Sequence, residues 1–409
     1  MPHRQAHHPT GPLAGMRILD ITTVLLGPYA TKILGDMGAD IIKIETIEGE
    51  GRRYSGPSRH KGMGATFMVL NRAKRALSIN LKDPAGREAF LRLAATADAV
   101  VHNARVQAIT RLGLDYEAVR KVKPDIVYCY AVGFGSKGRY AGRPAYDDVI
   151  QGLSGLPALA GQISGKPQFV PVNVADRVTG VFLANAVLAA LLHRARTGEG
   201  QQVEVPMFET MAEFVLSEHI WDDYFEPPVH TKNKIRLLDR RPYKTKDGYI
   251  CVMASSDRMF FDFCDLVGRP ELKDDPRFSE RSARAANLKE VYRITEEELA
   301  HRTSAEWLEM LEKADIPASP MHTIDTLLKD PHLADVDFFQ IEPHPTEGPV
   351  RTMKLPMHFS ATPAVNHRPT PHVGEQSIDV LREAGLSMQE IEKLIADGVV
   401  RAHEPDSKS

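Results

Sequence analysis

The residue best placed to carry chemistry is Asp176, which lies between an extended segment, 171–175, and an apolar run, 177–192. The apolar run predicts a buried helix, so Asp176 is expected at its N-cap, at the positive end of the helix dipole. An aspartate kept ionised there could act as a nucleophile. Aspartate is also a common N-cap residue in any protein, and the local sequence alone favours that plainer role.

A glycine-containing segment, 133–138, fits the pattern GxGxxG directly after a predicted strand. The residues that follow, 139–144, do not open a helix, so a bound pyrophosphate would lack the helix N-terminus that the dinucleotide fingerprint needs. An NAD-dependent oxidoreductase is therefore disfavoured. The segment is either a ligand loop whose backbone N–H groups face a developing oxyanion, or a plain surface turn.

Two groups of cations adjoin predicted strands: Arg105 and Arg111 after one strand, and Arg72, Lys74 and Arg75 before another. Arginine binds phosphate through two parallel hydrogen bonds. Because the two strands should lie side by side, both groups could form one anion pocket. The alternative is ordinary solvated surface charge.

Other catalytic chemistry lacks support in the sequence. The 16 histidines form no HExxH motif and no His/Cys tetrad, and no GxSxG precedes a helix, so we expect neither a metal nor a serine nucleophile. The three cysteines, Cys129, Cys251 and Cys264, show no CxxC spacing. This usage favours a reducing compartment, and the cytoplasm fits best.

Composition limits the possible partners. The 409 residues are 43% hydrophobic and 26% charged, which suits a folded protein with two domains. The net charge of −3 gives no overall basic field for nucleic acid or an anionic membrane. Residues 1–15 lack the apolar core of a signal peptide, and the longest apolar stretch, 181–192, is expected to be too short to span a bilayer.

The elements that must position these residues alternate in type. Strands are predicted at 16–21, 40–45, 99–102, 125–131 and 202–205, and helices at 28–37, 84–97, 116–121 and 177–192. This alternation predicts an α/β fold in which helices cover both faces of a parallel sheet. After Glu213 an aperiodic segment is interpreted as a linker. A strand at 249–253 and helices at 258–267, 288–301 and 304–314 then predict a smaller α+β domain.

From Gly11 to about Val400 the chain resembles the class III CoA-transferase family, which includes formyl-CoA transferase and carnitine CoA-transferase. The segments that carry the resemblance are GMRILD (15–20), GP (27–28), LGDMGADIIKIE (34–45), NRAKR (71–75), AYDDVIQ (145–151), Asp176 and RTGEGQ (196–201). Each segment is weak alone, but their order and spacing together specify the family.

The resemblance implies a Rossmann-like large domain with a parallel sheet, a smaller α+β domain inserted in it, and an obligate homodimer of interlocked subunits. Residues 1–215 would form the N-terminal part of the large domain, 225–320 the small domain, and 321–409 the part that returns to the large domain. The substrates implied are an acyl-CoA and a free carboxylic acid, so coenzyme A is the only cofactor expected.

The resemblance also implies that Asp176 is the nucleophile. Attack on the acyl-CoA thioester gives an aspartyl acyl anhydride and CoA thiolate, and the thiolate returns to the aspartyl carbonyl to give an aspartyl-CoA thioester. An acceptor carboxylate then attacks the aspartyl carbonyl in place of CoA, and CoA finally leaves as the thioester of the acceptor acid. This covalent route divides one difficult exchange into easier acyl transfers. The helix N-terminus is expected to favour the ionised aspartate, so no base is needed.

Further site residues are assigned by the resemblance, position by position. They are Val24 and Leu25 in the first βα loop, Leu81 near the adenine, Asn103, Arg105 and Arg111 around the phosphates, and Tyr146, Asp147 and the 133–138 loop at the thioester end.

Two departures from the family are visible. Asn103 is followed by Ala-Arg instead of an aromatic residue and Arg-Pro, which changes the local contact to adenine, and 233–247 lacks the glycine run of formyl-CoA transferase. The second departure favours an acid bulkier than formate or oxalate. Cations of the small domain suggest a dicarboxylate: Lys232, Lys234, Arg236, Arg240 and Arg241.

Two other functions stay open. An α-methylacyl-CoA racemase shares the fold but needs two acid/base groups, commonly a histidine paired with the aspartate. Tyr146 stands at the position of that histidine, and tyrosine, with a pKa of about 10, is a poor base near neutral pH. The other function is that of a CoA-binding protein without turnover, in which Asp176 only caps its helix.

Overall fold

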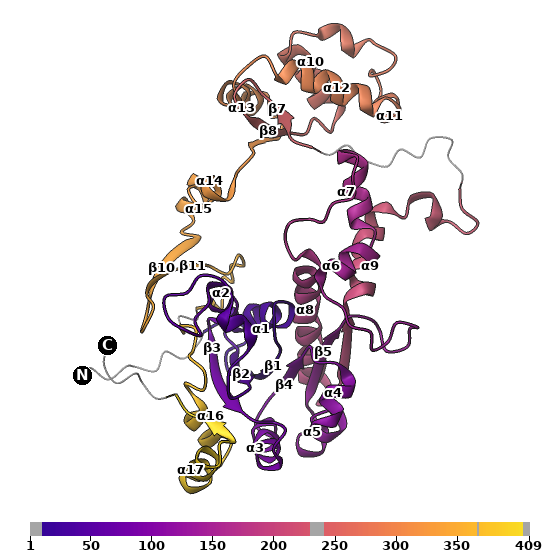
Figure 1. The fold of residues 1–409 in the computed structure, drawn as a ribbon. Helices are drawn as coiled ribbons and strands as arrows, with labels where there is room; N and C mark the ends of the chain where they lie inside the picture. The colour runs from indigo at the N-terminus through magenta and orange to yellow at the C-terminus, as the bar shows by residue number, and fades with distance from the viewer. Residues whose placement is uncertain (1–9, 230–240, 366–367, 404–409) are drawn as a thin grey trace. The chain divides into compact units, whose positions relative to one another are not determined.

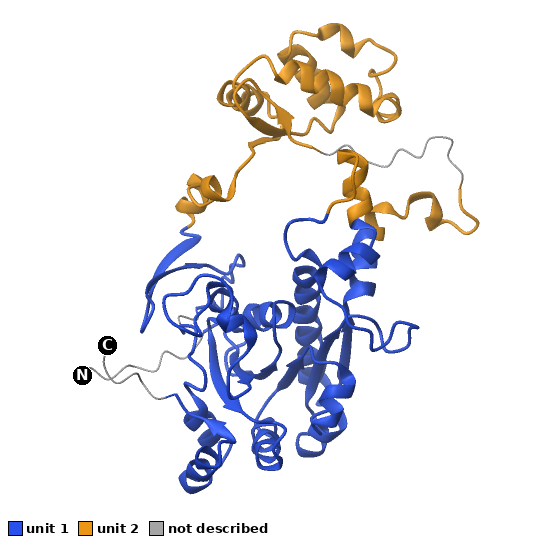
Figure 2. Ribbon diagram, viewed as in Figure 1, with its two compact units in different colours: residues 1–156, 169–215, 337–409 blue, residues 157–168, 216–336 orange. Residues whose placement is uncertain are grey.

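The computed structural model describes residues 10–229, 241–365 and 368–403. The chain separates into two compact units (Figure 2). Unit 1 contains residues 1–156, 169–215 and 337–409, and unit 2 contains residues 157–168 and 216–336. Residues 169–215 and 337–409 therefore join residues 1–156 in one unit, although residues of unit 2 separate them in the sequence.

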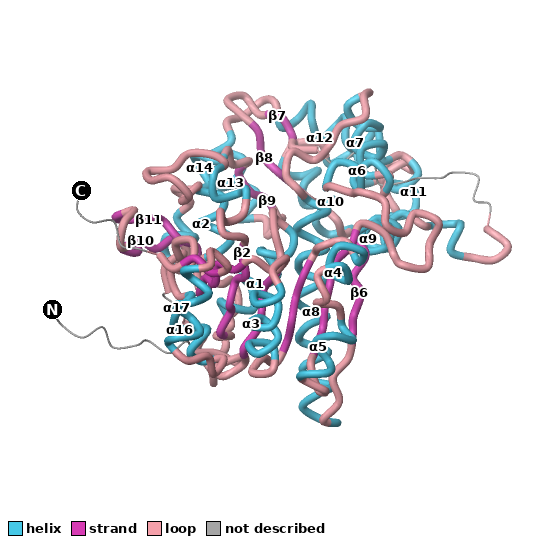
Figure 3. The backbone as a smooth tube through the Cα atoms, turned by 60° about the horizontal axis from the view of Figure 1, so that its bottom comes forward, coloured by secondary structure: helices cyan, strands magenta, loops and turns pink. Residues whose placement is uncertain are grey.

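Unit 1 is built on a seven-stranded sheet with the order β12-β3-β2-β1-β4-β5-β6 (Figures 1 and 3). Its strands are β1 (Arg17–Ile21), β2 (Asp40–Glu45), β3 (Lys74–Ile79), β4 (Ala99–His102), β5 (Val127–Val132), β6 (Gln202–Pro206) and β12 (Val400–Arg401). All neighbouring strands pair in parallel except β12, which pairs antiparallel with β3. The order of β1 to β6 is that of the Rossmann fold, so the predicted α/β fold with a parallel sheet is confirmed.

Successive residues of each strand pack on opposite faces of the sheet. Ile18 packs in a core with α1 and α8, whereas its neighbour Leu19 packs in a core with α3, α5, α16 and α17. The helices of unit 1 are α1 (Leu26–Asp36), α2 (Ala65–Asn71), α3 (Pro84–Ala94), α4 (Val106–Arg111), α5 (Tyr116–Val122), α6 (Asp147–Leu153), α8 (Val174–Thr197), α9 (Met207–His219), α16 (Ser377–Glu383) and α17 (Met388–Ala396). A 3-10 turn, η1 (Gly51–Tyr54), and a hairpin of β10 (Phe339–His344) and β11 (Gly348–Met353) complete the unit.

Helix α8 has 24 residues, and by length and composition alone it could cross a membrane. The helix extends beyond the apolar stretch 181–192 at both ends, from Val174 to Thr197. Within unit 1 the helix is part of the core, because Leu183, Val187 and Leu191 pack with residues of α1, β5 and β6. Its start passes close to α1, since a Cβ added at Gly180 would lie 2.8 Å from the carbonyl oxygen of Leu26.

Unit 2 contains a three-stranded antiparallel sheet of β7 (Tyr243–Lys244), β8 (Tyr249–Val252) and β9 (Ala318–Pro320). The helices at or beyond the boundary of unit 1 are α7 (Leu156–Ser164), α10 (Asp257–Leu266), α11 (Arg281–Ala286), α12 (Leu288–Leu299), α13 (Ser304–Lys313), α14 (Ile324–Leu327) and α15 (Pro331–Asp335), with 3-10 turns η2 (Trp221–Tyr224) and η3 (Pro270–Lys273). Phe263, Trp307 and Leu311 form its core with strand β8. The linker predicted after Glu213 is wrong at its start, because α9 continues to His219.

Candidate active site

A cavity of about 370 Å³ opens at the carboxyl ends of β1, β4 and β5. Its wall consists of residues from 23–26, 103–107, 131–136 and 141–146, together with Asp176, Glu204 and Met207. The sheet order reverses direction between β1 and β4, and open α/β sheets bind ligands at that point. The volume is within the range of small-molecule sites. This cavity is therefore the candidate active site of unit 1.

The cavity gathers six of the nine residues predicted for the site: Val24, Leu25, Asn103, Arg105, Tyr146 and Asp176. The other three lie elsewhere. Leu81 packs against the core beside α3, Arg111 is exposed in the last turn of α4, and Asp147 is buried at the first position of α6.

Asp176 is the third residue of α8, three residues beyond the N-cap, Asn173, so the N-cap predicted at Asp176 is wrong. Its side chain is only 9% exposed. Burial, and then the negative charge of Asp147, raise the pKa of Asp176 to about 6, while Arg177 and Arg52 act in the opposite direction. The expectation that the helix terminus makes this carboxyl easy to ionise is thus wrong in direction. A carboxyl with this pKa is still about 90% ionised at pH 7, so it needs no separate base.

Asp147 lies behind Asp176 rather than in the cavity wall. One oxygen of Asp147, Oδ1, accepts a hydrogen bond of 2.9 Å from the backbone N–H of Asp176, and Oδ2 accepts one of 2.6 Å from Nε2 of Gln151. Oε1 of Gln151 accepts in turn from the backbone N–H of Val170, at 3.0 Å. Through these bonds α6 holds both the first turn of α8 and the segment before it, at Val170. Sequence reasoning missed Gln151 because nothing in the local pattern distinguishes it.

Replacing Asp176 with asparagine is expected to stabilise the protein at neutral and alkaline pH. The pKa of Asp176 rises from 3.8 to about 6 on folding. Above pH 6 the folded chain therefore holds a carboxylate that the unfolded chain solvates better, whereas below about pH 4 the carboxyl is protonated in both states and the difference disappears. The stabilisation reaches at most about 3 kcal/mol. Thermal denaturation across this pH range measures it, and equal stability of both proteins at pH 8 would contradict the raised pKa.

The start of α1 faces the same cavity. Leu25, the N-cap residue, and Leu26 both line the cavity wall, and no side chain caps the helix. The first N–H groups of a helix have no intrahelical partner and carry a partial positive charge. They can therefore stabilise negative charge that develops on an oxygen in the cavity.

Two N–H groups of the glycine loop 133–138 are not free to act as such donors. The backbone N–H of Gly135 donates to Oε1 of Glu209, and that of Ser136 donates to Oε1 of Glu204, both at 2.9 Å. A Cβ at Gly133 would lie 2.4 Å from Cβ of Ala145. Gly133 thus allows close packing, and two carboxylates occupy two of the N–H groups that were candidates for an oxyanion site.

The predicted anion pocket shared by two groups of cations is wrong. Lys74 lies inside β3, is fully buried, and pairs with Oδ2 of Asp20 at 2.8 Å. Arg75 pairs with Asp40 at 2.5 Å and also with Glu383. Neither cation is solvated surface charge either, because both are buried and each is paired with a carboxylate.

Cationic charge in the cavity wall comes instead from Arg105 and Arg143. Arg105 is exposed just before α4, and the guanidinium of Arg143 lies 4.4 Å from the ring centre of Tyr140. Within the described part of the chain, no group of three or more His, Cys, Asp or Glu side chains could hold a metal ion.

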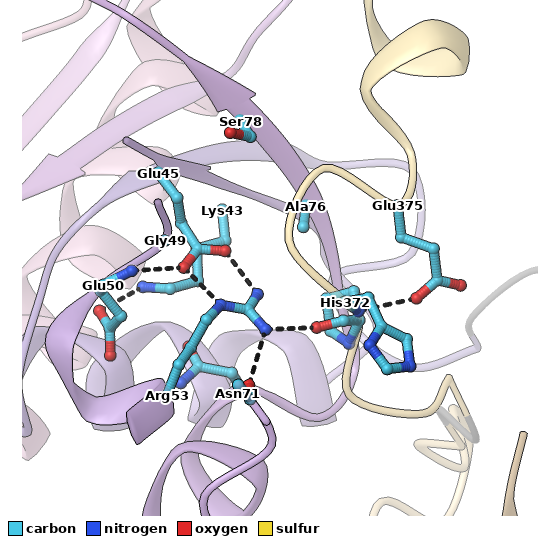
Figure 4. Close-up of polar contacts among 12 residues, drawn as sticks. Lys43, Glu45, Gly49, Glu50, Arg53, Asn71, Ala76, Ser78, His372 and Glu375 are labelled. Carbon is cyan, nitrogen blue, oxygen red and sulfur yellow. Dashed lines mark hydrogen bonds and ion pairs between the residues drawn. The ribbon is translucent and has the colours of Figure 1, made fainter. Parts of the chain in front are cut away.

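A buried ionic cluster (Figure 4) contacts the first βα loop. Lys43 pairs with Oε2 of Glu50 at 2.9 Å, and Arg53 pairs with Oε2 of Glu45 at 2.6 Å. The ammonium of Lys43 also donates to the carbonyl of Thr22 at 3.0 Å. The cluster therefore connects β2 to the loop that carries the cavity residues 23–26.

The sequence profile described as CoA-transferase family III matches residues 13–377. The chain belongs to this family. A succinate-glutarate CoA-transferase of Agrobacterium fabrum is 32% identical over 94% of this chain and 97% of its own length. An acetyl-CoA:oxalate CoA-transferase of Acetobacter aceti is 35% identical over 76% of this chain and 81% of its own. The crystal structure of Rv3272 from Mycobacterium tuberculosis has a TM-score of 0.80 and 30% identity, covering 90% of this chain and 99% of that one.

Membership of the family makes this chain an enzyme of the CoA-transferase type, which confirms the resemblance seen in the sequence. The matched region, 13–377, contains every strand that forms the cavity and all nine predicted site residues. The cavity wall of this enzyme thus combines a buried carboxylate, two cations and the uncapped start of a helix.

Proposed function

We propose that this enzyme moves CoA from an acyl-CoA thioester to a free carboxylic acid, with Asp176 as the nucleophile and aspartyl anhydride and aspartyl-CoA as intermediates. One observation carries the proposal. Asp176 is a shielded carboxylate in the wall of the cavity at the reversal point of the sheet, and it stays mostly ionised at neutral pH. The uncapped start of α1 in the same wall supports the negative charge that each acyl transfer develops.

Coenzyme A fits the chemistry of the remaining wall. Val24 and Leu25 give it an apolar part suited to the pantetheine chain, and Arg105 and Arg143 give it positive charge for the phosphates. Arg111, at the end of the helix that Arg105 precedes, extends that positive charge along α4. Leu81 stays a predicted contact of the adenine end, and Tyr146 one of the thioester end.

A dicarboxylic acid is the acceptor that we propose. The name of the relative from A. fabrum supports the proposal, because it refers to succinate and glutarate. Arg52 and Arg177 both lower the pKa of Asp176, so they are close enough to attract an incoming carboxylate. Of the cations on which the sequence prediction rested, Arg241 pairs with Glu296 at 3.0 Å. The others lie outside the described residues, as does most of the glycine-free segment 233–247.

We also propose that the enzyme acts as an interlocked homodimer in the cytoplasm, without nucleic acid or membrane as a partner. The large domain would comprise residues 1–215 and 321–409, and the small domain residues 225–320. Apolar side chains on α8 support an association of subunits, since Val181, Phe182 and Leu192 are 41%, 43% and 61% exposed. A second copy of the chain could cover them.

Trapping the covalent intermediate tests the function. Enzyme incubated with succinyl-CoA and then with hydroxylamine or borohydride is expected to carry a modified Asp176, because both reagents attack an aspartyl thioester. Mass spectrometry of the digested protein locates the modification. An unmodified protein that binds CoA would support the non-catalytic alternative. Solvent deuterium entering the α-carbon of an acyl-CoA, without any acceptor acid, would support the racemase.

A further inference from the structure

Asn103 uses both polar atoms of its side chain on the backbone of one residue. Nδ2 donates to the carbonyl oxygen of Thr23 at 2.8 Å, and Oδ1 accepts from the N–H of Thr23 at 2.9 Å. Asn103 follows β4, while Thr23 follows β1, the neighbouring strand. The amide therefore joins two loops of the cavity wall through one N–H of Nδ2 and one lone pair of Oδ1.

The residue before Thr23 is held in the same manner. Asp20 accepts hydrogen bonds from the N–H of Thr22 at 2.9 Å and from its hydroxyl at 2.5 Å. Lys43 donates to the carbonyl of Thr22 at 3.0 Å. Two consecutive residues thus have both backbone polar groups fixed by side chains that come from β1, β2 and the loop after β4.

The next residue, Val24, has a φ of +72°. This is the left-handed region, which is strongly unfavourable for a β-branched side chain. Such a conformation persists only where the surrounding structure imposes it. Val24 lines the cavity, and directly after it come Leu25, the N-cap, and Leu26, the first residue of α1. The conformation of Val24 consequently sets the direction in which α1 enters the site.

We propose that Asn103 is a positioning residue for CoA transfer. By holding Thr23 it keeps Val24 in the left-handed conformation, and this fixes the start of α1 in the cavity wall that also contains Asp176. The inference rests on the proposed function only for the expected change in kcat/KM. This positioning role is distinct from the direct contact between Asn103 and CoA that the family resemblance implies.

A double-mutant cycle between Asn103 and Val24 tests this role. Glycine adopts a positive φ without strain, so a chain with Val24→Gly needs the Asn103 clamp less. Asn103→Ala is expected to lower kcat/KM about 10- to 100-fold when Val24 is present, the range that backbone strain of this kind supports. In the Val24→Gly background the same substitution is expected to lower it less than about 3-fold. The dissociation constant of CoA, measured by calorimetry, should show the same coupling.

Equal losses in both backgrounds would overturn the proposal and favour a direct contact between Asn103 and CoA. If Asn103→Ala does not fold, Asn103→Asp carries the same cycle, because it keeps the acceptor for the N–H of Thr23 and loses the donor to its carbonyl. A wild-type enzyme that exchanges no CoA would refute the proposed function. The cycle would then still be read from the CoA dissociation constants, so the two failures are distinguishable.

Discussion

Asp176→Ala is expected to lower the rate of CoA exchange by a factor of at least about 10⁴, because no intermediate forms without the attacking carboxylate. The affinity for CoA should change less than about 3-fold, since the proposed cationic contacts, Arg105 and Arg143, remain. Exchange between succinyl-CoA and glutarate, followed by chromatography of the two thioesters, measures the rate. Calorimetry measures the affinity.

The matched control is Asp148→Ala. Asp148 is an exposed carboxylate in the first turn of α6, and it does not line the cavity. Its removal changes the net charge as much as Asp176→Ala does, and exchange should continue at the wild-type rate. If Asp176→Ala kept a tenth of the activity, or if its only effect were on stability, the assignment of Asp176 as nucleophile would be abandoned.

Lys74→Met is expected to lower the free energy of unfolding by about 3–5 kcal/mol, because it leaves the carboxylate of Asp20 buried without its nearest cation. Both side chains are fully buried, and their ion pair is 2.8 Å long. The ammonium of Lys74 also donates to Oγ1 of Thr31 and Oδ1 of Asn71, so two further polar atoms lose a donor. Urea denaturation followed by circular dichroism measures the change.

Lys393→Met serves as the control for this substitution. Lys393 also forms an ion pair of 2.8 Å, with Asp397, but its side chain is 76% exposed on α17. A solvated pair of this kind contributes about 0.5 kcal/mol or less, so the variant should unfold almost as the wild type does. Similar destabilisation by both substitutions would contradict the claim that burial makes the Lys74 pair important.

Strands and helices with strong local patterns were predictable from the sequence. β2 and β4 have the predicted bounds, because each is a short segment that contains consecutive β-branched residues, Ile41-Ile42 and Val100-Val101. The helices α2, α4 and α6 were not predicted, since each has only six or seven residues and too few turns for a period to show. The cations at the start of β3 were misplaced for a different reason. Lysine and arginine read as surface residues until the carboxylates that pair with them, distant in sequence, are known.

The candidate nucleophile illustrates the same division. The aspartate before an apolar run drew attention to Asp176 but favoured a capping role, whereas the order of the weak motifs identified the family and, by resemblance, made Asp176 the candidate nucleophile. The ionisation of Asp176 was not accessible, because it depends on burial and on Asp147, which is 29 residues earlier in the chain. The role of Asn103 was hidden as well, since its partner Thr23 is 80 residues away.

The sequence by itself therefore determined the alternating elements and the parallel sheet, because these follow from short-range patterns, and the order of its motifs along the chain determined the class of reaction. Tertiary structure alone decided which charges are neutralised, which N–H groups stay available, and which side chains reach the cavity. Such properties depend on distances and on the exclusion of water between segments that only folding brings together.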